Sequence, residues 1–71
     1  MQTNNATLKV GDLIEMQLAF EEVASGIVLD VDLKRYDYEF PPYKIHWLDN
    51  MVAGMQVTWQ NPDEIELVSR G

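Results

Sequence analysis

Apolar and polar residues alternate along this chain in short segments that are separated by turn residues. Side chains two positions apart share one face of a strand, so this alternation predicts strands with one buried face. The predicted strands cover residues 13–20, 26–34, 43–48, 55–60 and 65–68. Strands this short can hide an apolar face only by curling together. We therefore predict an all-β fold, a small five-stranded and strongly bent antiparallel barrel.

The larger apolar residues of each segment indicate which side should be buried. The set expected to face inward is Ile14, Met16, Leu18, Phe20, Ile27, Leu29, Val31, Leu33, Tyr43, Ile45, Trp47, Met55, Val57, Trp59, Ile65 and Leu67. Core packing is the default role for the two tryptophans in this set. Asp30 and Asp32 then lie on the solvent face of the second strand.

Glycine, proline and asparagine mark the connections. Gly11 belongs to the turn before the first strand, and Gly26 allows a bulge or a close backbone approach. Residues 34–42 alternate rings with charges, so we expect the second strand to continue into a long hairpin arm that Pro41 and Pro42 end. Residues 61–64 predict one helical turn before the last strand, with Asn61 as its cap and Pro62 at its first position.

The 71 residues predict one domain at 9–68, with a flexible tail at 1–8 and a C-terminal tail at 69–71. A domain of this size buries a modest core and often needs extra support. The chain has no cysteine, which excludes disulfides as that support, and its single histidine disfavours a zinc site. Association with further copies, giving a homo-oligomer, is the support we expect.

The net charge of −7 disfavours nucleic acid as a partner, because that binding relies on lysine and arginine at phosphates. No stretch reaches the ~20 apolar residues that span a bilayer, and residues 1–10 lack the apolar core of a signal peptide. We expect no membrane partner. The expected location is the cytoplasm of a host cell or a virus particle.

The layout of the chain is similar to that of Src-homology-3-like barrels. It begins with Gly11-Asp12-Leu13-Ile14, continues with Gly26-Ile27-Val28 and Val31, and ends with a helical turn before a short last strand. The Gly-x-Val-x-x-Val stretch resembles a KOW-type element of that class. In its small size and acidic composition the chain also resembles accessory proteins of tailed phages. The Sm-like barrel is the close alternative, although the Asp-x-x-Met-Asn motif of its RNA pocket has no counterpart after Asp32.

Chemical sites are hard to find in this chain. Asp30, Asp32, Asp37 and Glu39 form an acidic cluster, but a calcium loop beginning at Asp30 would need Gly at its sixth position and Glu at its twelfth. Arginine and proline stand there, so we interpret the cluster as a solvated strand face. His46 points away from the predicted core and has no designated partner for acid–base chemistry. We expect no enzyme activity, no metal and no cofactor.

Aromatic side chains alternate with charged ones, including lysine and arginine, where the pattern continues past the predicted end of the second strand. Such surfaces bind peptides or single-stranded nucleic acid. The candidate partner-binding residues are Lys34, Arg35, Tyr36, Tyr38, Phe40, Tyr43, Lys44 and His46. A cap over the barrel end or a subunit contact is the favoured interpretation of the rings. The leading hypothesis is a non-enzymatic interaction or assembly module, phage-encoded, that contacts a protein partner or itself. The alternative is an Sm-like or KOW-like domain that binds RNA or single-stranded nucleic acid.

Overall fold

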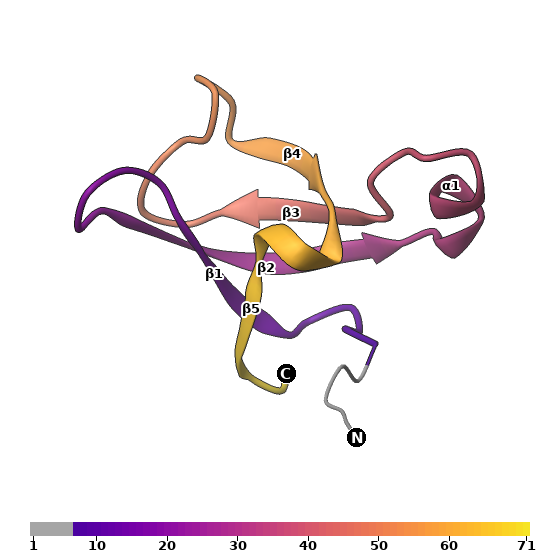
Figure 1. The fold of residues 1–71 in the computed structure, drawn as a ribbon. Helices are drawn as coiled ribbons and strands as arrows, with labels where there is room; N and C mark the ends of the chain where they lie inside the picture. Colours follow the sequence, from indigo (N-terminus) through magenta and orange to yellow (C-terminus); the bar gives the residue numbers. More distant parts are fainter. Residues whose placement is uncertain (1–6) are drawn as a thin grey trace.

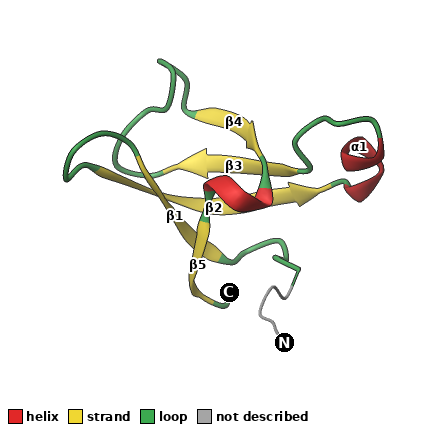
Figure 2. Cartoon of the chain, viewed as in Figure 1, coloured by secondary structure: helices red, strands yellow, loops and turns green. Residues whose placement is uncertain are grey.

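The computed structural model describes residues 7–71, which form one antiparallel sheet, one short helix and one 3₁₀ turn (Figures 1 and 2). The elements are β1 (Leu13–Gln17), β2 (Val23–Val31), α1 (Leu33–Asp37), β3 (Tyr43–Trp47), β4 (Val57–Gln60), η1 (Pro62–Glu64) and β5 (Glu66–Ser69). The predicted all-β class is confirmed, with five strands and a helical turn before the last one.

The strands follow the order β4-β3-β2-β1-β5, and every neighbouring pair is antiparallel. The first four strands form a meander, and β5 returns to pair with β1. Figure 1 shows β1 and β5 crossing β3 and β4 at a steep angle, as expected of a strongly bent sheet. Within residues 7–71 no pairing joins β4 to β5, so the sheet is open and the predicted barrel closure is not observed.

The core lies on the concave side and contains the predicted faces of β1 and β3. Its buried hydrophobic residues are Leu8, Ile14, Ala24, Val28, Tyr43, Ile45, Trp47 and Ile65. The prediction for Phe20 is wrong, because its side chain is 99% exposed. A hydrogen bond from the Leu18 N–H to the Glu22 carbonyl closes a tight hairpin around it, so β1 ends at Gln17.

The predicted face of β2 is also wrong. The buried positions are the even-numbered Ala24, Gly26 and Val28, whereas Leu29 is exposed. The pairing with β3 shifts between Val28 and Asp30, and this bulge brings Val31 back against the core. The predicted close approach at Gly26 is confirmed, because a Cβ atom there would lie 2.5 Å from Cγ2 of Ile45.

Strand β4 turns its polar side chains inward, so the core positions predicted for Val57 and Trp59 are wrong. The core position predicted for Met55 is also wrong, because this residue precedes β4 and is 55% exposed. Gln60 is buried and Thr58 is partly buried. The indole N–H of Trp47 donates to the Thr58 hydroxyl at 2.8 Å, and that hydroxyl contacts Oε1 of Gln60 at 2.7 Å. A buried tryptophan N–H needs an acceptor, and β4 supplies it from this face.

The hairpin arm predicted over residues 34–42 is replaced by α1. Asp32 caps this helix, since its carboxylate accepts the Lys34 N–H at 3.2 Å. The chain leaves the helix through Glu39, which has a positive φ of 66°, and reaches β3 through the buried Pro42. The inward position predicted for Leu33 is therefore wrong, and its side chain is 52% exposed on α1.

The predicted turn at residues 61–64 is confirmed as η1. Asn61 is its N-cap and Pro62 its first residue. The Glu64 carboxylate accepts the Asn61 N–H and the side-chain amide of Gln60, both at 2.8 Å. These bonds attach the turn to the end of β4, and Ile65 then enters the core while Leu67 stays partly exposed.

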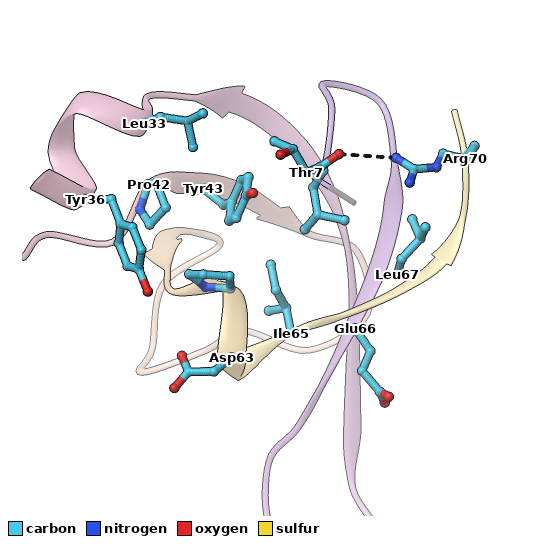
Figure 3. A pocket seen from close by; sticks show the side chains of 12 residues that line it. Thr7, Leu33, Tyr36, Pro42, Tyr43, Asp63, Ile65, Glu66, Leu67 and Arg70 are labelled. Atoms are coloured by element: carbon cyan, nitrogen blue, oxygen red, sulfur yellow. Dashed lines mark hydrogen bonds between the residues drawn. The ribbon is translucent and has the colours of Figure 1, made fainter. Parts of the chain in front are cut away.

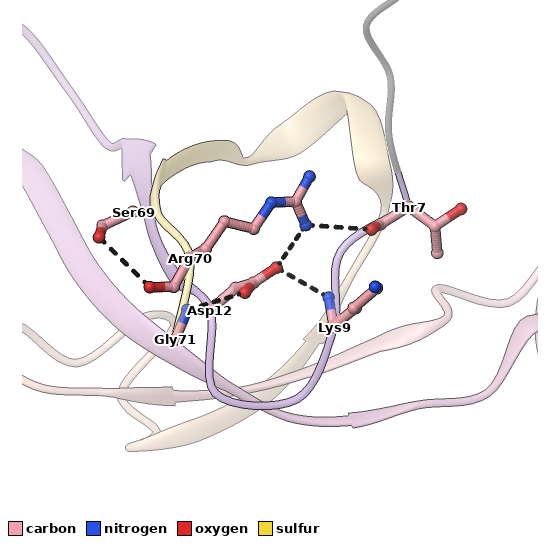
Figure 4. A network of polar contacts seen from close by, with 6 residues as sticks. All are labelled: Thr7, Lys9, Asp12, Ser69, Arg70 and Gly71. Atoms are coloured by element: carbon pink, nitrogen blue, oxygen red, sulfur yellow. Dashed lines mark hydrogen bonds and ion pairs between the residues drawn. The ribbon is translucent and has the colours of Figure 1, made fainter.

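The segments before β1 and after β5 lie together. Most of the tail predicted at 1–8 lies outside the described residues, and Leu8 is buried in the core. Ser69 still belongs to β5, and the Arg70 side chain and the Gly71 N–H both bond to Asp12 (Figure 4). Across residues 7–71, no helix has the length and apolarity needed to cross a membrane.

Candidate functional site

The structure divides the eight predicted site residues among four places. Arg35, Phe40 and Lys44 gather around Trp59, and Lys34 and Tyr38 are exposed at α1. Tyr36 and Tyr43 line a groove, and His46 lies on the outer face of the sheet. The predicted residues therefore do not form one continuous site.

Trp59 is the centre of the cluster that contains Arg35, Phe40 and Lys44, and the sequence did not indicate this role. The guanidinium carbon of Arg35 lies 3.9 Å from the centroid of the Trp59 ring, and Nζ of Lys44 lies 6.0 Å from it. Arg35 also lies 5.8 Å from the Phe40 centroid and donates from Nε to the Pro41 carbonyl at 2.9 Å. These are stacking distances for a cation on an aromatic ring, so the Trp59 cluster joins α1 to the sheet.

The outer face of the sheet carries a row of apolar side chains around His46. Leu13 pairs with Ile27, Ile27 with His46, and His46 with Val57, so the row crosses four strands. All four side chains are at least partly exposed. An antiparallel sheet with one solvated face usually carries polar residues there, so this outer row is unusual for an isolated domain.

The groove opens between α1, η1 and β5 and has a volume of about 700 Å³ (Figure 3). Tyr43 and Ile65, both buried in the core, form part of its lining. Its other apolar lining includes side chains that stay exposed: Leu33 at 52%, Tyr36 at 53% and Leu67 at 40%. The groove therefore gives a partner access to apolar surface beside the core.

Carboxylates surround η1 and the start of β5. Asp63 and Glu66 line the groove and also a second hollow of about 340 Å³, to which Glu15 and Glu64 contribute. Glu15 and Glu66 are direct cross-strand partners in the pairing of β1 with β5. Figure 3 shows Asp63 and Glu66 on one side of the groove and Arg70 on the other.

The Arg70 guanidinium is already engaged by Asp12. Its Nη1 lies 3.0 Å from the Asp12 carboxylate and 3.4 Å from the Thr7 carbonyl (Figure 4). The Asp12 carboxylate also accepts the N–H groups of Lys9 and Gly71, which lower its pKa below the usual value, the bond from Lys9 most strongly. The bond from the Ser25 N–H similarly lowers the pKa of Asp49. Both carboxylates hold the fold together.

Within residues 7–71, no group of three or more His, Cys, Asp or Glu side chains is placed to hold a metal ion. The acidic cluster predicted as a solvated strand face is dispersed, since Asp32 caps α1 and Asp37 ends it.

Comparison of the chain with protein-family models, with curated proteins and with solved structures finds no match. The Src-homology-3-like, KOW-like and Sm-like resemblances therefore stay predictions from the layout of the sequence.

Proposed function

We propose that this protein is a non-enzymatic interaction and assembly module that associates with further copies of itself through the outer row. The observation that supports this is the row Leu13, Ile27, His46 and Val57 on the outer face of the sheet. Apolar side chains that line up across neighbouring strands form one contiguous patch, unlike the scattered apolar residues of ordinary surfaces.

The energetics of a small domain favour the same conclusion. A 71-residue chain buries a limited core, and eight buried hydrophobic residues form it within residues 7–71. Pairing two outer faces would bury Ile27 and Val57 and remove apolar surface from water at a gain of about 25 cal/mol per Å². The partly exposed His46 in the middle of the row gives such an interface a polar contact.

Sedimentation velocity over a range of concentrations tests this function. We expect the parent to form species larger than the 8.2 kDa monomer. The double variant Ile27→Thr/Val57→Thr should shift the distribution toward the monomer. Threonine is β-branched and suits a strand, so the monomer fold should survive. Val68→Thr, an exposed position on β5, is the matched control and should associate like the parent. A parent protein that sediments as a monomer throughout would refute the proposal.

Nucleic-acid binding is a second candidate function, and the Trp59 cluster is the observation that favours it. Three of the five basic residues, Lys34, Arg35 and Lys44, lie on α1 and the adjoining β3. Aromatic side chains can stack on the nucleobases of a single strand, while lysine and arginine side chains contact its phosphates. Arg35 occupies one side of the Trp59 ring, and the net charge of −7 opposes binding.

Fluorescence anisotropy with labelled oligo-dT and oligo-U tests this candidate. Binding should appear at low salt and weaken steeply as salt rises. Lys44→Glu should abolish it, whereas Lys9→Glu, an equal charge change at an exposed site before β1, should reduce it less. Absence of binding at low salt, about 20 mM, where electrostatic screening is weak, would refute this candidate.

A further inference from the structure

We propose that the groove between α1, η1 and β5 binds an extended, cationic segment of a different protein. Apolar side chains of that segment would enter the groove, and its lysines or arginines would face the carboxylates around η1. This site shares no residue with the outer row, so it goes beyond self-association and can be tested apart from it.

The apolar part of the site is already formed. Leu33 and Tyr36 on α1 and Leu67 on β5 keep 40% to 53% of their surface exposed around a space of about 700 Å³. Preformed, mostly apolar concavities of this size are typical of binding sites, and exposed tyrosine is enriched where partners anchor. The groove is therefore ready for an apolar anchor without rearrangement of the core.

The charge of the partner follows from the arrangement of β1 and β5. Glu15 and Glu66 lie directly opposite each other, and like charges at such positions destabilise a sheet. Asp63 and Glu64 in η1 add two carboxylates beside them. Folding alone would favour a base at one of these positions. A cationic partner would relieve the repulsion, which gives electrostatic complementarity to the site.

The extended form of the partner follows from the position of β5. This strand is the last in the sheet order, and all four of its residues are exposed. An outermost strand offers backbone N–H and C=O groups on its open side, and extended peptides pair with such edges. A segment with alternating apolar and basic residues would place its apolar side chains toward one face and its charges toward the other.

The same charges exclude the other occupants. Nucleic acid carries phosphates, which Glu15, Asp63 and Glu66 repel. A second copy of this chain, with twelve acidic and five basic residues, offers few lysines or arginines to complement these carboxylates. The nearest base, Arg70, is held by Asp12 at 3.0 Å.

Fluorescence anisotropy with two labelled probe peptides tests the proposal on the full chain. The first is Lys-Leu-Lys-Phe-Lys-Val-Lys, and the second has glutamate in place of every lysine. We expect binding of the lysine peptide and none of the glutamate peptide at the same concentration. Glu66→Lys should weaken binding about fivefold or more. The same change creates an opposite-charge pair with Glu15, so the urea midpoint should stay equal or rise.

Matched variants separate the groove from general effects. Glu21→Lys changes the net charge by the same amount at the exposed hairpin tip and should bind the lysine peptide almost like the parent. Tyr36→Ala should weaken binding, whereas Tyr38→Ala, more exposed and outside the groove, should not. Ile27→Thr/Val57→Thr should bind the peptide normally, whatever its effect on self-association.

The proposal would be overturned if the parent did not bind the lysine peptide at about 1 mM. It would also be overturned if Glu21→Lys and Glu66→Lys weakened binding equally, or if the parent bound both peptides equally well. Loss of self-association in Glu66→Lys would instead assign the groove to a second copy and overturn it as well.

Discussion

At the scale of single residues, Phe20 is held in a conformation that its side chain does not favour. Its φ of 53° is in the left-handed region, and its ring is 99% exposed. That region costs a residue with a Cβ atom about 1–2 kcal/mol. Glycine adopts this conformation without that cost, but its greater backbone freedom in the unfolded state offsets part of the gain in stability. We predict that Phe20→Gly raises the free energy of unfolding by about 0.5–1 kcal/mol in urea denaturation.

The matched control for Phe20 is Phe20→Ala, which removes the ring and keeps the Cβ atom. It should leave the free energy of unfolding within about 0.5 kcal/mol of the parent. A large loss of stability in either variant would contradict this account, because it would show that the exposed ring contributes packing.

Gly26 illustrates the opposite constraint, in which the space is already filled. A Cβ atom there would lie 2.5 Å from Ile45 Cγ2 and 2.9 Å from Trp47 Cε3. We predict that Gly26→Ala lowers the free energy of unfolding by about 1–3 kcal/mol, as overpacking of a core does. Thermal and urea denaturation would measure it, and an unchanged midpoint would contradict the contact.

Single residues could be predicted where one force dominates. Trp47 is a large ring on a regular strand, and its burial followed from alternation alone. Trp59 shows the same alternation and lies on the other face, because Arg35 stacks on it there while Thr58 meets the indole of Trp47. Hydrophobicity along the chain carries no record of such distant partners, so the Trp59 cluster was found only in the structure.

At the scale of elements, the attachment of η1 to β4 depends on one carboxylate. Glu64 accepts the Asn61 N–H and the amide of the buried Gln60, both at 2.8 Å. Leaving a buried donor unsatisfied costs about 1–3 kcal/mol. We predict that Glu64→Ala lowers the free energy of unfolding by about 1–3 kcal/mol in urea denaturation.

Two variants check that prediction. Glu64→Gln keeps one acceptor oxygen and should lose less stability than Glu64→Ala. Asp63→Ala changes the neighbouring exposed carboxylate and should stay within about 0.5 kcal/mol of the parent. Equal losses in Glu64→Ala and Asp63→Ala would show that charge near η1 matters and the hydrogen bonds do not.

Elements with local signals were predicted and those with long-range causes were not. The turn η1 follows from Asn61 and Pro62, and β3 follows from three apolar residues between a diproline and a turn. Strand β2 shows equally clear alternation, yet its bulge at Leu29 reverses the buried face near the C-terminal end of the strand. The alternating rings of residues 36–40 imitate a strand, whereas the Asp32 cap starts a helix.

At the scale of the whole molecule, Asp12 joins the segment before β1 to the segment after β5 (Figure 4). Its pKa in the folded state lies below that in the unfolded state, mainly through the Lys9 N–H. The unfolded state therefore binds more protons, and the stability gained above about pH 4 is lost as the pH falls through the folded pKa. Asp49 contributes with the same sign. We predict that the urea midpoint is constant from pH 7 to 5 and falls below about pH 4.

Asp12→Asn isolates the share of Asp12 in this acid sensitivity. The variant should be less stable at pH 7, because the amide pairs less well with Arg70, and its midpoint should fall less between pH 5 and 3 than that of the parent. Adding Asp49→Asn should reduce the remaining slope further, because the pKa of Asp49 is lowered in the folded state as well. An unchanged slope in the single variant would contradict the role given to Asp12.

The overall architecture was more predictable than the site. Short alternating segments with strong turn residues are enough to indicate five antiparallel strands. Barrel closure depends on whether β4 meets β5, and no local pattern encodes that distance. The groove is lined from α1, η1 and β5, which lie far apart in the sequence, so it could not be anticipated from the eight predicted residues, only two of which line it.

The opposite placement of the two tryptophans gives the molecule two independent spectroscopic reporters. Trp47 is 1% exposed and should emit at short wavelength as an indole in an apolar medium does, and its emission should shift to the red when the core opens. Trp59 is partly exposed on the outer side, next to a guanidinium, and should respond to iodide or acrylamide. Trp59→Phe and Trp47→Phe would separate the two signals. Unfolding and docking on the outer side could then be followed in one cuvette without an added label.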